Sequence, residues 1–220
     1  MSAMRFANRL DAGRRLADDL ASRAFDRPVV IGLPRGGVPV AAEVAARLQA
    51  PLDVLVVRKL GYPVRPELGM GAVAEGEARV LNEDLIAELG VPVEQLEGVI
   101  AIENAEVKRR VHRYRGDRPA VILRGHTAIL VDDGLATGFT ARAGVEVLRR
   151  QGARSIVLAV PVAPIDAIRD LRTHADEVIC LSIPHRFMDI GRSYADFRPV
   201  TDDEVVELLA RHPVPTGTAH

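Results

Sequence analysis

The sequence is poor in cysteine, tryptophan and lysine, and these scarcities exclude whole classes of site. It has one cysteine and no tryptophan in 220 residues, and its basic residues are almost all arginine, with lysine only at Lys59 and Lys108. A single cysteine can form neither a disulfide framework nor a cysteine metal cluster. Because Cys180 lies in the apolar run EVICLSI, we expect it to be a buried core thiol.

The chain also lacks a marked net charge and a long apolar segment. Its formal net charge is −1, which argues against bulk nucleic acid or an anionic membrane as a partner. No apolar run approaches the roughly 18–20 residues that span a bilayer. The N-terminal stretch MSAMRFANRLDAGRRLADDLA lacks the apolar centre of a signal peptide. We therefore expect a cytoplasmic protein without a membrane contact.

What the chain does contain is enough apolar material for one substantial core. Hydrophobic residues make up 48% of the sequence, and 220 residues suffice for one domain with a small subdomain. We predict a single domain over residues 1–212, followed by a disordered tail over residues 213–220.

Strand-like and helix-like segments alternate along most of the chain. The strand-like runs are continuously apolar, as expected for a parallel sheet that is covered on both faces. This pattern predicts an α/β fold with a doubly wound, mainly parallel central sheet, helices on both faces and a small hood. The predicted strands are 28–33, 52–58, 127–132, 155–160 and 177–183, and the predicted helices between them are 38–49, 138–151 and 164–172.

A segment of different character, about residues 60–126, is inserted into this alternation. It is rich in Gly, Pro and Glu at its start, which predicts a mobile loop followed by a short hairpin around Glu75-Gly76-Glu77. A long helix over 93–115 follows. Helical spacing also predicts a first helix within residues 9–25, and a closing helix over 201–211 begins with a capping box, Thr201 with Glu204.

The stretch ILVDDGLATGFT, residues 129–140, sends a buried-type strand directly into two carboxylates and a loop of small residues. Small residues at a helix start let an anion approach the unpaired backbone N–H groups, and threonine hydroxyls add donors. Asp132 and Asp133 would repel a phosphate but accept hydrogen bonds from sugar hydroxyls, so ribose 5-phosphate fits both features. The predicted phosphate-binding residues are Ala136, Thr137, Gly138, Phe139 and Thr140.

This stretch resembles the PRPP-binding signature of the type I phosphoribosyltransferases: an apolar strand, two acids and a loop that ends in TGxT. Neither the Walker spacing nor GxGxxG is present. Further segments resemble a group of bacterial phosphoribosyltransferases whose acceptor is not generally assigned, and the resemblance covers most of residues 5–210. The segments that carry it are FANRLDAGRRLADDL, LPRGGVPVAAEVA, RKLGYPVRPELGMGAVAEG and FMDIGRSYADFRPVTDDEVVELL.

The resemblance implies a pyrophosphate site at two other strand ends. In this family the loop after the first core strand binds pyrophosphate through backbone amides, often with an unusual peptide bond. This implies roles for Arg35, Gly36 and Gly37, and for the basic residues Arg58 and Lys59 that end the second strand. A tight turn with an exposed arginine and a solvated strand end are the alternatives.

The resemblance also implies two flexible or variable parts. The segment 60–76 corresponds to the family's lid, whose Arg65 is a further candidate for pyrophosphate. Residues 184–198 correspond to the hood over the acceptor, where Phe187, Tyr194 and Phe197 are candidates for stacking on it. Core packing explains the same three aromatic residues equally well.

The implied reaction displaces pyrophosphate from C1 of PRPP by a nitrogenous acceptor, with a purine-type base as one candidate. Asp132, Asp133 and Lys59 are the implied catalytic residues, and Mg²⁺ would be bound by Asp132 or Asp133 directly or through water. Hypoxanthine–guanine enzymes typically have Asp where this chain has Ala136, which disfavours a 6-oxopurine. The resemblance further implies nucleotide metabolism such as purine salvage, and homodimers are common in the family.

A rival hypothesis is a regulator that keeps the fold and senses PRPP or a nucleotide without catalysis. The basic stretch over residues 108–115 favours it, because such a stretch can contact nucleic acid. A solvated helix end explains that stretch as well. The pyrophosphate loop and the lid favour an enzyme, since a sensor of nucleoside monophosphates needs neither.

Overall fold

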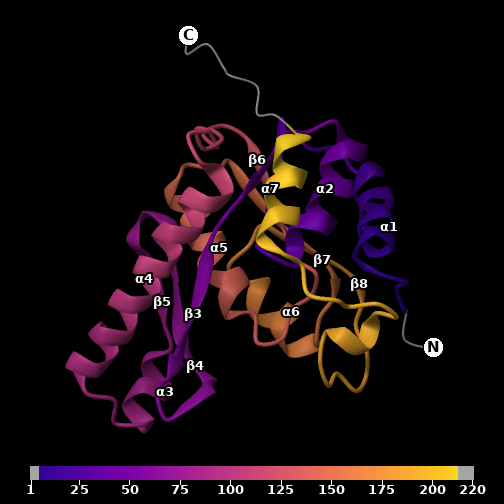
Figure 1. Ribbon diagram of the computed structural model, residues 1–220. Coiled ribbons are helices and arrows are strands. Elements are labelled where there is room, and N and C mark those ends of the chain that lie inside the picture. The colour runs from indigo at the N-terminus through magenta and orange to yellow at the C-terminus, as the bar shows by residue number, and fades with distance from the viewer. Residues whose placement is uncertain (1–4, 213–220) are drawn as a thin grey trace.

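The computed structural model describes residues 5–212, apart from the side chain of Glu67 (Figure 1). The predicted tail, residues 213–220, lies outside the described residues. No helix within the described part is long and apolar enough to cross a membrane.

A five-stranded parallel sheet forms the centre of the molecule, which confirms the predicted fold class. Its strand order is β2-β1-β6-β7-β8. The first βαβ unit therefore winds in one direction from β1 and the second unit in the other direction from β6, so the winding changes direction between these two strands. The strands are β1 (Pro28–Gly32), β2 (Leu52–Val54), β6 (Thr127–Val131), β7 (Ser155–Val162) and β8 (Glu177–Ser182).

Helices cover both faces of this sheet, because alternate residues of each strand point to opposite faces. In β6, Ile129 and Val131 join the core under α1, α2 and α7, whereas Ala128 and Leu130 join the core under α5 and α6. The predicted first helix ends earlier than residue 25. The covering helices are α1 (Arg9–Ala21), α2 (Gly37–Leu48), α5 (Phe139–Arg150), α6 (Ile165–Leu171) and α7 (Asp202–Ala210).

A second, antiparallel sheet stands beside the first and forms what we call the arm (Figure 1). The predicted strand 52–58 is divided, because the chain leaves the parallel sheet after β2 and enters the arm at β3. Residues 60–76, predicted as a mobile loop, are instead mostly strand. The arm consists of β3 (Val57–Tyr62), β4 (Arg65–Ala74) and β5 (Ala78–Leu81), and a short helix, η1 (Glu75–Glu77), makes the predicted hairpin turn.

Two glycines of this segment, Gly61 and Gly71, allow close pairing of strands and do not make the segment flexible. Gly71 has a φ of +151°, and a Cβ there would lie 2.1 Å from the carbonyl oxygen of Val80 on the neighbouring strand. A Cβ on Gly61 would lie 2.9 Å from the carbonyl oxygen of Pro66, and the strand register shifts on both sides of Gly61. Glycine in these strands therefore marks bulges and close backbone contacts.

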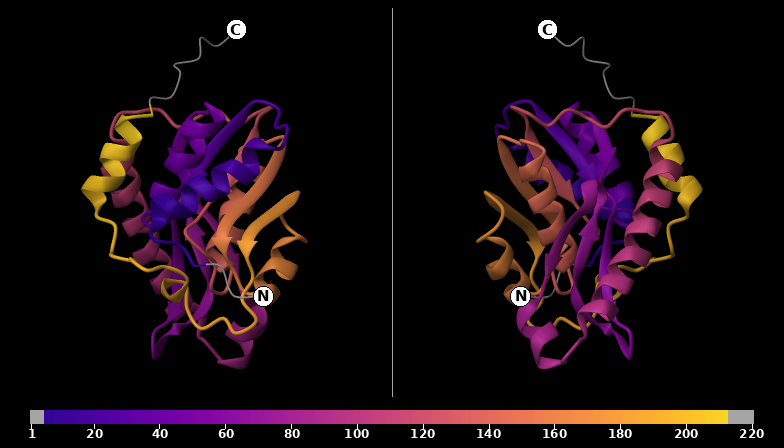
Figure 2. Two further views of the ribbon diagram at one scale, coloured as in Figure 1. Left: turned by 90° about the vertical axis from the view of Figure 1, so that its right-hand side faces the viewer. Right: turned by 90° about the vertical axis from the view of Figure 1, so that its left-hand side faces the viewer.

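Two helices follow the arm, α3 (Glu83–Glu88) and α4 (Val93–Arg115), and α7 lies alongside α4 (Figure 2). The long helix α4 has the predicted bounds. A short helix, η2 (Gly191–Ser193), begins the segment 191–198, which we call the strap. The strap pairs with the chain near Phe6, where Tyr194 forms a parallel bridge.

Candidate active site

The acidic pair, Asp132 and Asp133, lies directly against the loop Pro34–Gly37. The two segments meet because they follow β1 and β6, which are neighbours in the sheet. A Cβ on Gly36 would lie 2.0 Å from Oδ2 of Asp133, and one on Gly37 would lie 2.6 Å from the carbonyl oxygen of Val131. Both glycines are therefore needed for space, and the Pro34–Arg35 peptide bond is cis.

The carboxyl groups of the acidic pair are in an environment that disfavours their charge. Burial and the neighbouring Asp133 raise the pKa of Asp132 well above its ordinary value. Burial also raises the pKa of Asp133, although the Arg9 guanidinium acts in the opposite direction. Oδ1 of Asp132 accepts a hydrogen bond of 2.8 Å from the Asp133 N–H. A cation or a pair of sugar hydroxyls at this point would relieve the desolvation and repulsion of the pair.

The acidic pair also fits the way Mg²⁺ is held in phosphate-transfer sites. Within the described residues, no group of three or more His, Cys, Asp or Glu side chains converges as a metal cage. Two adjacent carboxylates suit an ion that keeps several waters and takes further oxygens from a substrate phosphate. The residues present are thus compatible with Mg²⁺ that is bound together with a phosphorylated ligand.

Two helices that start beside this junction have bare N-termini. Among the α-helices of the described residues, only α2 and α5 begin with neither a side-chain cap nor an acidic residue in the first turn. Helix α2 follows Gly36, and α5 follows Gly138, which has a φ of +80° that favours glycine. The positive end of the helix dipole favours an anion at both places, and at α5 the unpaired N–H groups of the first turn add donors. At α2 the Val38 N–H donates to the Arg35 carbonyl oxygen at 3.2 Å, so the dipole is the main attraction there.

Of the two predicted amide donors, Gly37 is already engaged. Its N–H donates to the carbonyl oxygen of Leu33 at 3.0 Å. Gly37 thus serves the close approach of the two strand ends in this conformation, and its role toward pyrophosphate stays a prediction.

The predicted basic residues point in different directions. Lys59 lies with Gly69 near the start of α5, since a Cβ on Gly69 would be 3.0 Å from Cε of Lys59 and 3.6 Å from the Phe139 ring. Arg58, the preceding residue on β3, is held by Glu103 of α4 at 2.7 Å. Successive residues of a strand face opposite sides, so only Lys59 is directed toward the loop that precedes α5.

Arg35 is oriented by the C-terminal helix rather than by the acidic pair. Its guanidinium lies 3.6 Å from Oδ1 of Asp202, the first residue of α7. The same oxygen accepts a hydrogen bond of 2.7 Å from the Tyr114 hydroxyl. Because the Arg35 pair is partly exposed, its contribution to stability is small and an incoming anion can compete for it.

The three candidate hood aromatics gather in one cluster. Tyr194 is only 3% exposed, stacks on Phe197 with ring centroids 4.9 Å apart, and donates from its hydroxyl to the Asp133 carbonyl oxygen at 2.5 Å. Phe187 is partly buried against the same cluster. Tyr194 therefore holds the backbone of Asp133. Stacking of Phe187, Tyr194 or Phe197 on an acceptor stays a prediction.

Sequence reasoning missed Arg9. Its guanidinium binds Asp133, covers the Phe197 ring and reaches the strap. Helical spacing places Arg9 on the polar side of α1, and nothing in that spacing reveals a partner 124 residues away.

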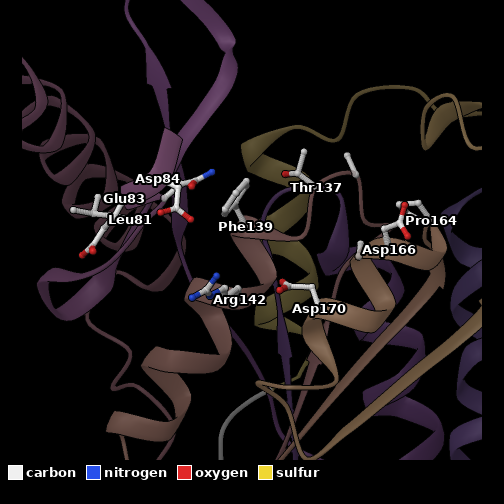
Figure 3. A pocket seen from close by; sticks show the side chains of 12 residues that line it. Leu81, Glu83, Asp84, Thr137, Phe139, Arg142, Pro164, Asp166 and Asp170 are labelled. Atoms are coloured by element: carbon white, nitrogen blue, oxygen red, sulfur yellow. The ribbon is translucent and has the colours of Figure 1, made fainter. Parts of the chain in front are cut away.

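A cavity of about 740 Å³ adjoins the small-residue loop 134–140, and neither residue of the acidic pair lines it (Figure 3). Thr137 and Phe139 line it together with Arg142 of α5 and Asp170 of α6. The cavity also has three other carboxylates, from Glu83, Asp84 and Asp166. This acidic lining disfavours a phosphate inside the cavity, so the phosphate would have to bind at the backbone of the loop.

Comparisons with known proteins identify relatives over most of the chain. The family model described as "Phosphoribosyl transferase domain" matches residues 6–194. A Mycobacterium tuberculosis protein named "Putative phosphoribosyl transferase" is 48% identical over 206 residues, which are 94% of this chain and 46% of that protein. The chain thus spans about half the length of that relative.

Two further matches cover most of both partners. An adenine phosphoribosyltransferase of Mycobacterium marinum is 31% identical over 180 residues, which are 77% of this chain and 76% of that protein. The crystal structure of TT1426 from Thermus thermophilus is similar with a TM-score of 0.82 at 43% identity, and the match covers 96% of this chain and 100% of that one.

Proposed function

Since the chain belongs to the phosphoribosyl transferase domain family, we propose that it transfers the 5-phosphoribosyl group of PRPP to a nitrogenous acceptor and releases pyrophosphate. The observation that carries the proposal is the junction of β1 and β6, where an acidic pair lies between two helices whose N-termini are bare. PRPP has the matching groups: a ribose with vicinal hydroxyls between a 5-phosphate and a pyrophosphate.

Each part of the junction then has one task. The loop Ala136–Thr140 and the start of α5 bind the 5-phosphate. The acidic pair accepts hydrogen bonds from the ribose hydroxyls, and Asp132 or Asp133 would hold Mg²⁺ directly or through water. The ion supplies neutralisation of charge on the pyrophosphate when it is bound.

The leaving group would lie at the loop Pro34–Gly37. Arg35 exchanges its partner Asp202 for pyrophosphate, and Lys59 approaches from the arm. Arg58 would need to leave Glu103 to take part. Catalysis in this scheme comes from positioning and from stabilising charge as pyrophosphate departs.

We propose a purine-type base other than a 6-oxopurine as the acceptor. Ala136 stands where hypoxanthine–guanine enzymes have Asp, and the relative from M. marinum is named an adenine phosphoribosyltransferase. Phe187 is the hood residue best suited to stack on the acceptor, because Tyr194 and Phe197 stack on each other. We extend the proposal to a role in cytoplasmic purine salvage, with a homodimer as the working form.

The rival function, a regulator that senses PRPP or a nucleotide without catalysis, draws only weak support from the basic stretch 108–115. Every basic residue of the stretch 108–115 except His112 has an acidic partner: Lys108 pairs with Glu77, Arg109 and Arg110 with Glu106, Arg113 with Asp203, and Arg115 with Asp53 and Glu75. Paired cations offer little net charge to a phosphate backbone.

The first test is binding and turnover of PRPP. Calorimetry with Mg²⁺ should detect PRPP binding to the wild-type chain, and Asp132→Asn combined with Asp133→Asn should abolish it, because the ribose hydroxyls and the ion lose their acceptors. Each single substitution should weaken binding about 10-fold or more, the cost of one charge-assisted hydrogen bond. Asp18→Asn, an exposed residue of α1, is the control.

Incubation of the wild-type chain with PRPP and a panel of nucleobases then identifies the acceptor by release of pyrophosphate. We expect more pyrophosphate to be released with adenine-type bases than with 6-oxopurines. Unchanged PRPP affinity in the double variant would remove the acidic pair from the site. PRPP binding without release of pyrophosphate for any acceptor would favour the sensing function.

A further inference from the structure

Arg9 joins three groups that are far apart in the sequence. Its Nε donates to Oδ2 of Asp133 at 2.7 Å, a terminal nitrogen donates to the carbonyl oxygen of Arg198 at 2.8 Å, and the guanidinium lies 3.8 Å from the centre of the Phe197 ring. Only 11% of the side chain of each partner in the Arg9–Asp133 pair is exposed.

We propose that Arg9 is a positioning residue, which holds the Asp133 carboxylate and the strap in the arrangement that PRPP requires. The inference rests on the proposed function, because it assigns Arg9 a task at the same site. Arg9 itself does not touch the reacting atoms in this scheme, and it acts through Asp133.

Asp133 needs such a partner because of its surroundings. Asp133 is 7% exposed and stands next to a second carboxylate, and its Oδ2 is so close to Gly36 that a Cβ there would lie 2.0 Å away. Arg9 binds that same oxygen and fixes it above Gly36. A carboxylate has about four lone-pair sites, so Oδ1 keeps the capacity to accept a hydrogen bond from a ribose hydroxyl or from a hydrated cation.

The local structure fixes Arg9 in place. Asn8 caps α1 by accepting a hydrogen bond of 3.0 Å from the Asp11 N–H, which sets Arg9 as the first residue of the helix. From the other side, the Tyr194 hydroxyl donates to the Asp133 carbonyl oxygen. Asp133 is therefore held by its carboxylate from α1 and by its backbone from the strap.

Only arginine fits all three contacts. A planar guanidinium can donate in two directions while one face rests on an aromatic ring, whereas a lysine ammonium is a point charge without a flat face. A merely structural ion pair would also keep α1 and the strap together, so the two roles must be separated by a measurement that stability does not determine.

The experiment is a double-mutant cycle on the affinity for Mg²⁺ and PRPP, measured by calorimetry on the full chain. Arg9→Ala should weaken PRPP binding about 10-fold or more, because the Asp133 carboxylate is no longer held for its own charge-assisted hydrogen bond to the ribose. In an Asp133→Asn background, Arg9→Ala should cost less than about 3-fold further, because Arg9 acts through that carboxylate. Arg14→Ala, an exposed residue of the same helix that pairs with Glu43, should leave affinity unchanged.

Thermal unfolding shows whether each variant is folded before binding is measured. If Arg9→Ala does not fold, Arg9→Lys takes its place in the cycle, with a smaller loss and the same non-additivity. PRPP affinity equal to wild type in a folded Arg9 variant, or the same loss with and without the Asp133 carboxylate, overturns the inference. Failure of the wild-type chain to bind PRPP instead overturns the proposed function, so the two failures are distinct.

Discussion

Single atoms decide the fit between the loop Pro34–Gly37 and the acidic pair. Gly36 has a φ of −61°, which any residue can adopt, so its conformation does not require glycine. What requires glycine is space, because a Cβ would lie only 2.0 Å from Oδ2 of Asp133. The two glycines of the motif LPRGG thus allow the ends of β1 and β6 to lie close together.

Gly36→Ala should therefore damage the site. The added methyl group would push the Asp133 carboxylate away from Arg9, at a cost of about 1–3 kcal/mol in the free energy of unfolding. We expect PRPP affinity to fall about 10-fold or more, as for the loss of a charge-assisted hydrogen bond. Calorimetry and urea unfolding measure the two effects.

Gly98→Ala is the matched control for that substitution. Gly98 lies inside α4, and a Cβ there would meet nothing within 4 Å. Alanine should stabilise the helix by about 0.5–1 kcal/mol and leave PRPP binding unchanged. A Gly36→Ala variant that binds PRPP as tightly as Gly98→Ala would contradict the role of space at Gly36.

The sequence predicted which residues end the strands of the site, but not which residues support them. Asp132 and Asp133 follow from strand and loop chemistry, which is local. Arg9 and Tyr194 reach Asp133 only through tertiary packing, and Arg58 turns away because strand residues alternate. Local patterns carry no signal for such partners, which lie 124 residues from Asp133 for Arg9 and 61 residues for Tyr194.

At the scale of helices, the chain caps α7 fully and leaves α2 and α5 bare. In α7, Thr201 and Glu204 form the predicted capping box, and Glu204 also accepts a hydrogen bond of 2.6 Å from Arg198 of the strap. The Arg198 side chain and the Thr201 backbone N–H lower the pKa of Glu204 to about 2. The cap therefore ties the strap to α7.

This lowered pKa predicts an acid-dependent loss of stability. A carboxyl group whose pKa is lower in the folded state than its ordinary 4.5 contributes stability above pH 4.5, and the contribution is lost as the pH falls toward 2. Glu204→Gln should lower the urea midpoint at pH 7 and reduce its change between pH 4.5 and 2.5.

The exposed Glu207→Gln on the same helix serves as the control and should lower the midpoint at pH 7 by less. Equal acid dependence of wild type and Glu204→Gln would show that the cap does not contribute in this range.

The arm is the element that the sequence described least well. Its glycines and prolines favour a loop by composition, yet they allow bulges and close strand contacts in an antiparallel sheet. Four of the five parallel strands and the helix over 93–115 were predicted with nearly their observed bounds, whereas the predicted strand 52–58 is divided between the two sheets. A high glycine content therefore does not by itself distinguish a mobile loop from a closely packed strand.

At the scale of the whole molecule, one buried ion cluster joins the arm to the parallel sheet. Arg115, at the end of α4, lies 3.3 Å from Asp53 of β2 and 2.8 Å from Glu75 in the hairpin turn. Its side chain is 10% exposed, and it also donates to the Val54 carbonyl oxygen at 2.8 Å. The cluster sits where the chain passes from one sheet to the other.

Arg115→Ala should destabilise the protein by about 3–5 kcal/mol, because it leaves two carboxylates buried without their cation. Urea unfolding measures this. Lys108, on the same helix as Arg115, forms an exposed ion pair with Glu77 of the hairpin turn. Lys108→Ala should change the free energy of unfolding by less than about 1 kcal/mol. A similar loss of unfolding free energy for both variants would mean that the buried ion cluster contributes no more to stability than an exposed ion pair.

The strap contacts can form only late in synthesis of the chain. Arg9 leaves the ribosome long before its partner Arg198, which lies 189 residues later in the chain. Domains generally fold as units during synthesis, so the acidic pair gains the contacts with Tyr194 and Arg198 only after the strap has left the ribosome. A nascent chain that ends before residue 198 lacks the Arg198 contact of Arg9, and we expect it to bind PRPP more weakly than the full chain.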